Sequence, residues 1–182
     1  MLLVLSQTVP ILTIALYSMF PPLKGANASF WWHPFLFTVA FCAQAIGALI
    51  MKQRKPVFNY HLATASISST CTFLSAYLIY QSRTNGHFHT WHGLIGVVAW
   101  ASYAFLVTFS SLFLFPGFLK NMMARNTRRK LHNTGAKWIL FIFATNILVG
   151  LDKTGMGVSA GALPLVFNIL IVTTAVSTIV RI

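Results

Sequence analysis

The sequence predicts an all-α membrane protein with six transmembrane helices, and three observations support this prediction. Of its 182 residues, 57% are hydrophobic and only 8% are charged. The charges are also one-sided, because 13 Lys and Arg residues oppose a single acid, Asp152, for a formal net charge of +12. Apolar runs long enough to cross about 30 Å of hydrocarbon follow one another with short polar stretches between them. This composition argues against a water-soluble globular domain.

Six apolar runs have the length of a membrane span, about 20 residues each. They cover residues 2–20, 28–51, 56–80, 88–115, 129–151 and 162–180. The first run lacks the basic segment that opens a secretion signal and carries Pro10 in its middle, so we expect it to remain as a span. No repeat, low-complexity tract or linker interrupts the helices. We therefore predict one transmembrane domain over residues 1–182.

Basic residues gather in two of the short stretches between the runs, and these predict the orientation. Lys52, Arg54 and Lys55 follow the second run, and Lys120, Arg125, Arg128, Arg129 and Lys130 follow the fourth. Positive loops remain on the side from which a membrane protein inserts, so both termini should face the cytoplasm or its equivalent. An endomembrane or the inner mitochondrial membrane would fit. Because this rule accounts for the positive charge, we do not expect nucleic acid as a partner.

Four of the six histidines lie at matching depths in the middle four runs. They are His33, His61, His92 and His132, each about five residues inside the N-terminal edge of its run and so roughly 7 Å deep. Because consecutive helices are antiparallel, His33 should share an outer level with His92, and His61 an inner level with His132. Ionisable side chains within a span are costly and usually functional.

Two level-matched histidine pairs on facing helices are what two metalloporphyrins need as axial ligands. Structural zinc is the competing use, but it requires four Cys or His ligands, and neither pair has a third candidate at its level. Gly93, Gly96 and Gly135 would leave room for a porphyrin, although small residues also serve close helix packing. Two axial histidines leave no open coordination position, which favours electron transfer over oxygen activation. For any one histidine alone, an interfacial hydrogen bond is the alternative.

Short motifs surround three of these histidines. They are Trp32-His33-Pro34, Thr90-Trp91-His92-Gly93 with Gly96, and Leu131-His132-Asn133-Thr134-Gly135. With a histidine at the corresponding place in Asn59-Tyr60-His61, they resemble the second to fifth helices of the cytochrome b-561 family of transmembrane oxidoreductases. The resemblance extends from about residue 10 to residue 180.

This resemblance implies a core of the second to fifth helices that holds two b-type haems. His33 and His92 would bind one haem, and His61 and His132 the other. Members of the family take electrons from cytosolic ascorbate and deliver them to monodehydroascorbate or to ferric complexes. The resemblance therefore implies transmembrane electron transfer, with an ascorbate-dependent or ferric reductase as the enzymatic activity.

The resemblance also suggests where a small reductant such as ascorbate would bind. Lys52 partly matches the family's ascorbate-binding lysines, and Arg54 and Lys55 lie nearby. Arg125 and Arg129 lie where members of the family place an arginine before the fifth-helix histidine. The same cations could instead hold anionic lipid. A different class of function is also open, a haem-bearing, non-catalytic subunit of a respiratory-type membrane complex. Acidic partner chains would then balance the charge, and a homodimer is a further possibility.

Overall fold

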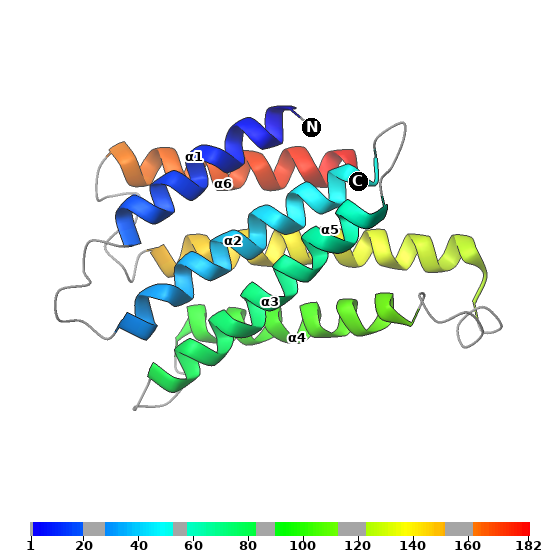
Figure 1. Ribbon diagram of the computed structural model, residues 1–182, viewed down its shortest axis with the longest axis horizontal. Coiled ribbons are helices and arrows are strands. Elements are labelled where there is room, and N and C mark those ends of the chain that lie inside the picture. Colours follow the sequence, from blue (N-terminus) through cyan, green and yellow to red (C-terminus); the bar gives the residue numbers. More distant parts are fainter. Residues whose placement is uncertain (1, 20–27, 53–57, 83–89, 113–122, 152–161) are drawn as a thin grey trace.

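The computed structural model describes residues 2–19, 28–52, 58–82, 90–112, 123–151 and 162–182, and all regular structure in these ranges is helical (Figure 1). The helices are α1 (Leu2–Met19), α2 (Ala28–Ile50), α3 (Phe58–Ser82), α4 (Trp91–Ser111), α5 (Arg125–Leu151) and α6 (Ala162–Arg181). Consecutive helices run in opposite directions (Figure 1). The predicted all-α class is therefore confirmed.

Three stretches of the described residues have the length and apolar composition of a membrane span. They are Trp32–Ile50, Phe58–Ser82 and Trp91–Ser111. The apolar helix Leu165–Arg181 is shorter. Six membrane crossings stay a prediction from the sequence.

Three helix boundaries differ from the predicted ones by three or four residues. α4 ends at Ser111 rather than at residue 115. The other two differences have identifiable reasons. α4 begins at Trp91 rather than at residue 88, because the Thr90 side chain caps the helix by accepting a hydrogen bond of 3.2 Å from the backbone N–H of Gly93. α5 begins at Arg125 rather than at residue 129. Hydropathy marks the edge of the apolar layer, whereas the helix continues through Arg and Lys, which are good helix formers.

α2 and α5 occupy the middle of the bundle, with α1 and α6 on one side and α3 and α4 on the other (Figure 1). α2 packs most extensively against α3, and α5 packs against α4, α2 and α6. Each of the four helices α2 to α5 therefore has a close neighbour within this set. α1 and α6 pack against each other and against α2, outside the four-helix core.

The α2–α3 contact is built from small and hydroxyl side chains. The buried residues of α3 are Ser68, Thr72 and Ser75, whereas apolar side chains such as that of Tyr77 are exposed. The Ser68 hydroxyl donates to the carbonyl of Ala40 on α2 at 3.0 Å. In a membrane, helices associate through such close packing while their apolar faces contact lipid. The arrangement fits a helix surrounded by lipid on its exposed side.

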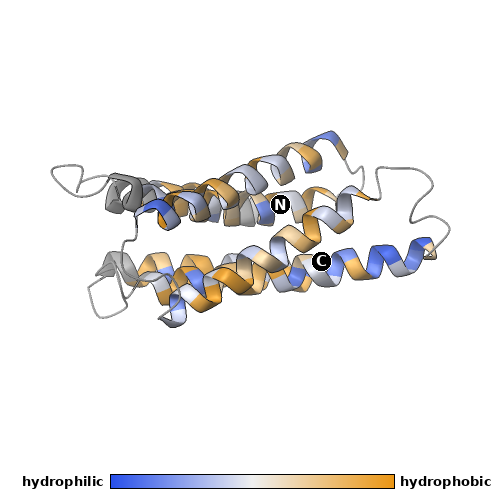
Figure 2. Ribbon diagram, turned by 90° about the horizontal axis from the view of Figure 1, so that it is seen from below, coloured by the Kyte–Doolittle hydropathy of each residue, from blue (hydrophilic) through white to orange (hydrophobic). Residues whose placement is uncertain are grey.

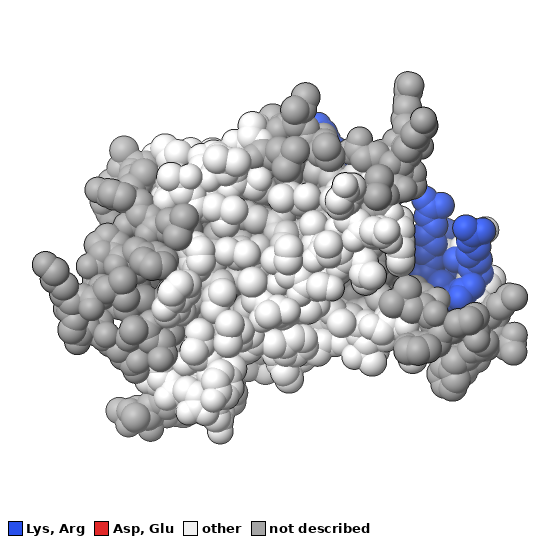
Figure 3. All heavy atoms as spheres, viewed as in Figure 1, with Lys and Arg blue, Asp and Glu red and all other residues white. Residues whose placement is uncertain are grey.

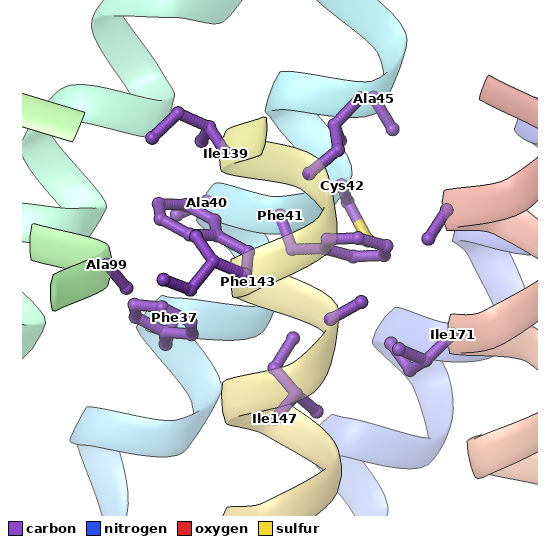
Figure 4. Close-up of a cluster of buried hydrophobic side chains, with 14 of the residues drawn as sticks. Phe37, Ala40, Phe41, Cys42, Ala45, Ala99, Ile139, Phe143, Ile147 and Ile171 are labelled. Atoms are coloured by element: carbon purple, nitrogen blue, oxygen red, sulfur yellow. The ribbon is translucent and has the colours of Figure 1, made fainter. Parts of the chain in front are cut away.

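Aromatic side chains fill the centre of the four-helix core. The ring centre of Phe37 lies 4.6 Å from that of Phe143, and Phe143 lies 5.4 Å from Tyr103. All three side chains are buried, and Figure 4 shows Phe37 and Phe143 beside one another between α2 and α5. The Tyr103 hydroxyl lies 3.2 Å from that of Ser69 and so joins α4 to α3.

Cationic side chains gather at one end of the bundle (Figure 3). We call this the basic end and define it by Lys52, Arg125, Arg128, Arg129, Lys130 and Arg181. The first turns of α5 extend there as a hydrophilic helix beyond the apolar part of the bundle (Figure 2). α2, α4 and α6 end at the basic end, and α1, α3 and α5 begin there (Figure 1).

Candidate functional site

The structure brings His33 on α2 and His92 on α4 together at the end of the bundle opposite the basic end. Their ring centres lie 6.1 Å apart and the ring planes are inclined by 72°. We call these two residues the outer pair. Both side chains are half-buried between the helices.

His61 on α3 and His132 on α5 form the corresponding inner pair, near the basic end. Their ring centres are also 6.1 Å apart, with the planes inclined by 80°. Two imidazoles that share one metal, each bonded at about 2 Å and each with its ring centre about 1 Å behind the nitrogen, have centres about 6 Å apart. Both pairs therefore have the separation that a shared iron requires.

Every one of the four histidines contacts the neighbouring helix through Nδ1. His33 Nδ1 donates to the carbonyl of Ser75 at 3.0 Å, and His61 Nδ1 donates to that of Gly47 at 2.9 Å. These two bonds link α2 and α3 reciprocally, because each helix supplies one histidine and one acceptor. The Ser75 hydroxyl adds a contact of 2.8 Å to His33 Nδ1.

The same exchange joins α4 and α5. His92 Nδ1 donates to the carbonyl of Asn146 at 3.1 Å, and His132 Nδ1 lies 2.8 Å from the hydroxyl of Ser110. A histidine that donates from Nδ1 coordinates a metal through Nε2, and such a bond fixes both the tautomer and the ring orientation. The donor set therefore suits axial ligation.

The two histidine levels are well separated along the bundle. On α2, Gly47 contacts His61 of the inner pair and follows His33 of the outer pair by 14 residues. On α5, Asn146 contacts His92 of the outer pair and follows His132 of the inner pair by 14 residues. At 1.5 Å per residue both counts give about 21 Å between the levels. The aromatic layer of Phe37, Phe143 and Tyr103 lies between them.

Two glycines allow the histidines to lie against their neighbouring helices. A Cβ at Gly150 would lie 2.7 Å from Cε1 and 3.0 Å from Nδ1 of His92, and a Cβ at Gly47 would collide with Thr64, one turn from His61. Neither glycine stands out in the sequence, because a single glycine within an apolar run has many possible reasons. Only the approach of the neighbouring helix identifies them.

One of the glycines that the sequence suggested as room for a porphyrin packs closely against the neighbouring helix. A Cβ at Gly135 would lie 2.7 Å from Leu106, whereas one at Gly96 would meet the Asn146 side chain at an ordinary 3.7 Å. Close helix packing, the alternative role of small residues, is therefore supported at Gly135.

The described residues contain no group of three or more His, Cys, Asp or Glu side chains that could hold a metal ion. Within that part of the chain, a tetrahedral zinc site built from protein ligands alone lacks a third ligand. Two opposed imidazoles are sufficient for a haem, whose porphyrin supplies the other four nitrogens.

Of the basic residues expected near the inner pair, the structure describes Lys52, Arg125 and Arg129, whereas Arg54 and Lys55 lie outside the described residues. Arg125 and Arg129 are exposed in the first two turns of α5. They precede His132 by seven and three residues, a spacing that places them on the same side of the helix as His132. The Lys52 ammonium donates to the carbonyl of Ile182 at 2.8 Å, beside the end of α6.

Comparison with known proteins finds one family match. The family model described as eukaryotic cytochrome b561 matches residues 32–157, more than half of the chain. The matched range includes all four histidines and α3 to α5 in full, and it leaves out α1 and α6. No curated protein and no solved structure matches the chain.

Proposed function

Because the chain belongs to the eukaryotic cytochrome b561 family, whose members transfer electrons across membranes through b-type haem, we propose that it carries two such haems and connects the two membrane faces. The outer pair would hold one haem and the inner pair the other. When bound, the haem irons supply one-electron oxidation and reduction. The observation that carries the proposal is the equal 6.1 Å separation within both pairs.

The protein's contribution is to hold four imidazoles in a fixed direction. Each Nδ1 contacts a group on the neighbouring helix, which leaves Nε2 as the ring nitrogen available to bind iron. Outer-shell bonds of this kind orient the ligand and increase its basicity. The aromatic layer of buried side chains lies between the two levels.

We propose further that the chain crosses the membrane six times and that the basic end faces the cytoplasm. The whole sequence holds a single acid, Asp152, which follows the opposite end of α5. Asp152 lies outside the described residues. Because no described residue is acidic, the basic end presents a surface that attracts anions.

For the electron donor, we propose ascorbate, the reductant used by the family. Arg125 and Arg129 would attract this anion to the same side of α5 as His132, at about 10 Å and about 5 Å along the axis. Anionic lipid headgroups would be attracted by the same charges. The acceptor would be monodehydroascorbate or a ferric complex at the outer face.

The test is ascorbate reduction of the purified full chain, followed in the haem absorption bands at low and high ionic strength. Ascorbate should reduce the inner haem first, and salt should slow the reaction because it screens the arginines. The double variant Arg125→Gln, Arg129→Gln should slow reduction without loss of haem. Arg181→Gln, which removes a charge from the same end but from α6, is the matched control.

The outcomes separate the two anions and the two roles of the chain. If the arginines hold lipid, the double variant should lose binding to vesicles that contain anionic lipid while its reduction rate stays at the wild-type value. Reduction by dithionite but not by ascorbate would contradict the proposed donor and favour a haem-bearing subunit. A purified chain without haem would refute the proposed function itself.

A further inference from the structure

The four histidines differ in the chemical group that contacts Nδ1. For His33, His61 and His92 this group includes a backbone carbonyl of the neighbouring helix. A carbonyl only accepts, so it selects the imidazole with its proton on Nδ1 and its lone pair on Nε2, the form that binds a metal. For His132 the contact is to the hydroxyl of Ser110, which can donate or accept.

Ser110 is directed across to α5, unlike its neighbour in the last turn of α4. The Ser111 hydroxyl donates to the Val107 carbonyl within α4 at 2.8 Å, a common intrahelical bond for serine. The Ser110 hydroxyl instead lies 2.8 Å from His132 Nδ1. Two adjacent serines therefore have different roles, one within its helix and one at the inner pair.

We infer that Ser110 is a positioning residue for His132. Its oxygen accepts the Nδ1 proton of His132 and thereby keeps the lone pair on Nε2, the nitrogen that would bind the iron. The inference rests on the proposed function, in which these two histidines hold the inner haem. If Ser110 donated instead, Nε2 would carry the proton and could not bind a metal.

The consequence is that the Ser110 side chain contributes to the ligand strength of His132. An imidazole that donates from Nδ1 is a stronger base and therefore stabilises the ferric state. Removing the Ser110 oxygen should lower the affinity for the inner haem by about 10-fold or more, within the range usual for outer-shell partners. It should also raise the midpoint potential of the inner haem.

The experiment compares Ser110→Ala with Ser110→Thr, which keeps the hydroxyl, in the purified full chain. Haem retention on dilution and the two midpoint potentials are the readouts. We expect Ser110→Ala to weaken the inner haem and raise its potential, with the outer haem unchanged and Ser110→Thr close to wild type. Ser110→Ala with wild-type affinity and potentials would overturn the inference while leaving the proposed function intact.

One further variant serves as a control. Ser111→Ala removes only an intrahelical bond and should have no effect on either haem. A loss of inner haem in Ser111→Ala equal to that in Ser110→Ala would show damage to α4 and refute a specific role for Ser110.

A readout without haem separates the failure of this inference from that of the proposed function. The ¹⁵N chemical shifts of the His132 ring report which nitrogen carries the proton. In the full chain without haem, Ser110→Ala should decrease the share with the proton on Nδ1, and Ser111→Ala should not. If the wild-type chain binds no haem, this measurement alone decides the inference, and equal shifts in Ser110→Ala and wild type would overturn it.

Discussion

Gly150→Ala should selectively weaken the outer haem. The added Cβ would lie 2.7 Å from Cε1, 3.0 Å from Nδ1 and 3.3 Å from Nε2 of His92, on a ring that is rigid and held by Asn146. Carbon atoms pack at about 3.5 Å or more, so the ring must move by about 0.8 Å. The bond from Nδ1 to the Asn146 carbonyl is 3.1 Å long and is lost by about 3.6 Å.

The magnitude follows from the cost of overpacking. Inserting a methyl group into a tightly packed site costs about 1–3 kcal/mol. At 1.4 kcal/mol per factor of ten, this lowers the affinity for the outer haem by about 5- to 140-fold. Alanine is a better helix former than glycine by about 1 kcal/mol, so a loss cannot come from a weakened helix.

The assay is titration of haem into the purified chain, with the outer and inner haems separated by their spectra and potentials. Gly96→Ala is the matched control on the facing helix, because its Cβ would meet the Asn146 side chain at an ordinary 3.7 Å. We expect Gly150→Ala to lose outer haem only and Gly96→Ala to keep both. Two haems at wild-type affinity in Gly150→Ala would refute the placement of His92 against α5.

Three other outcomes are expected. The wild-type chain should bind two low-spin haems. Replacing either member of the outer pair by alanine should remove one spectral component, and replacing either member of the inner pair should remove the other. If an outer variant and an inner variant lost the same component, the pairing would be contradicted. Tyr103→Phe removes the bond to Ser69 and should lower stability in detergent by about 0.6–1 kcal/mol without changing haem content. Loss of haem from this variant would instead assign Tyr103 to a haem site. Gln7→Leu removes the hydrogen bonds that join α1 to Thr173 and Thr174 of α6. It should lower thermal stability by a similar amount while the haems stay bound. Release of haem from this variant would instead place α1 in the haem core.

Much of the candidate site follows from the sequence because it depends on helix length and direction. Apolar runs of about 20 residues predict the helices, and their alternation predicts which histidines share a level. His33 and His92 at one end, and His61 and His132 at the other, need no further information than this. The family resemblance drawn from the motifs around these histidines is confirmed by the family match over residues 32–157.

The groups around the histidines could not be read from the sequence. Three of the acceptors of Nδ1 include backbone carbonyls, which every residue possesses, so the letters at positions 47, 75 and 146 do not mark them. Lys52, expected beside the inner pair, donates to a carbonyl at the end of α6. Composition and periodicity determined which helices form and how deep each histidine lies. The rotation and close approach of neighbouring helices decided which carbonyl, hydroxyl or glycine meets each ring, because these depend on packing between segments far apart in the chain.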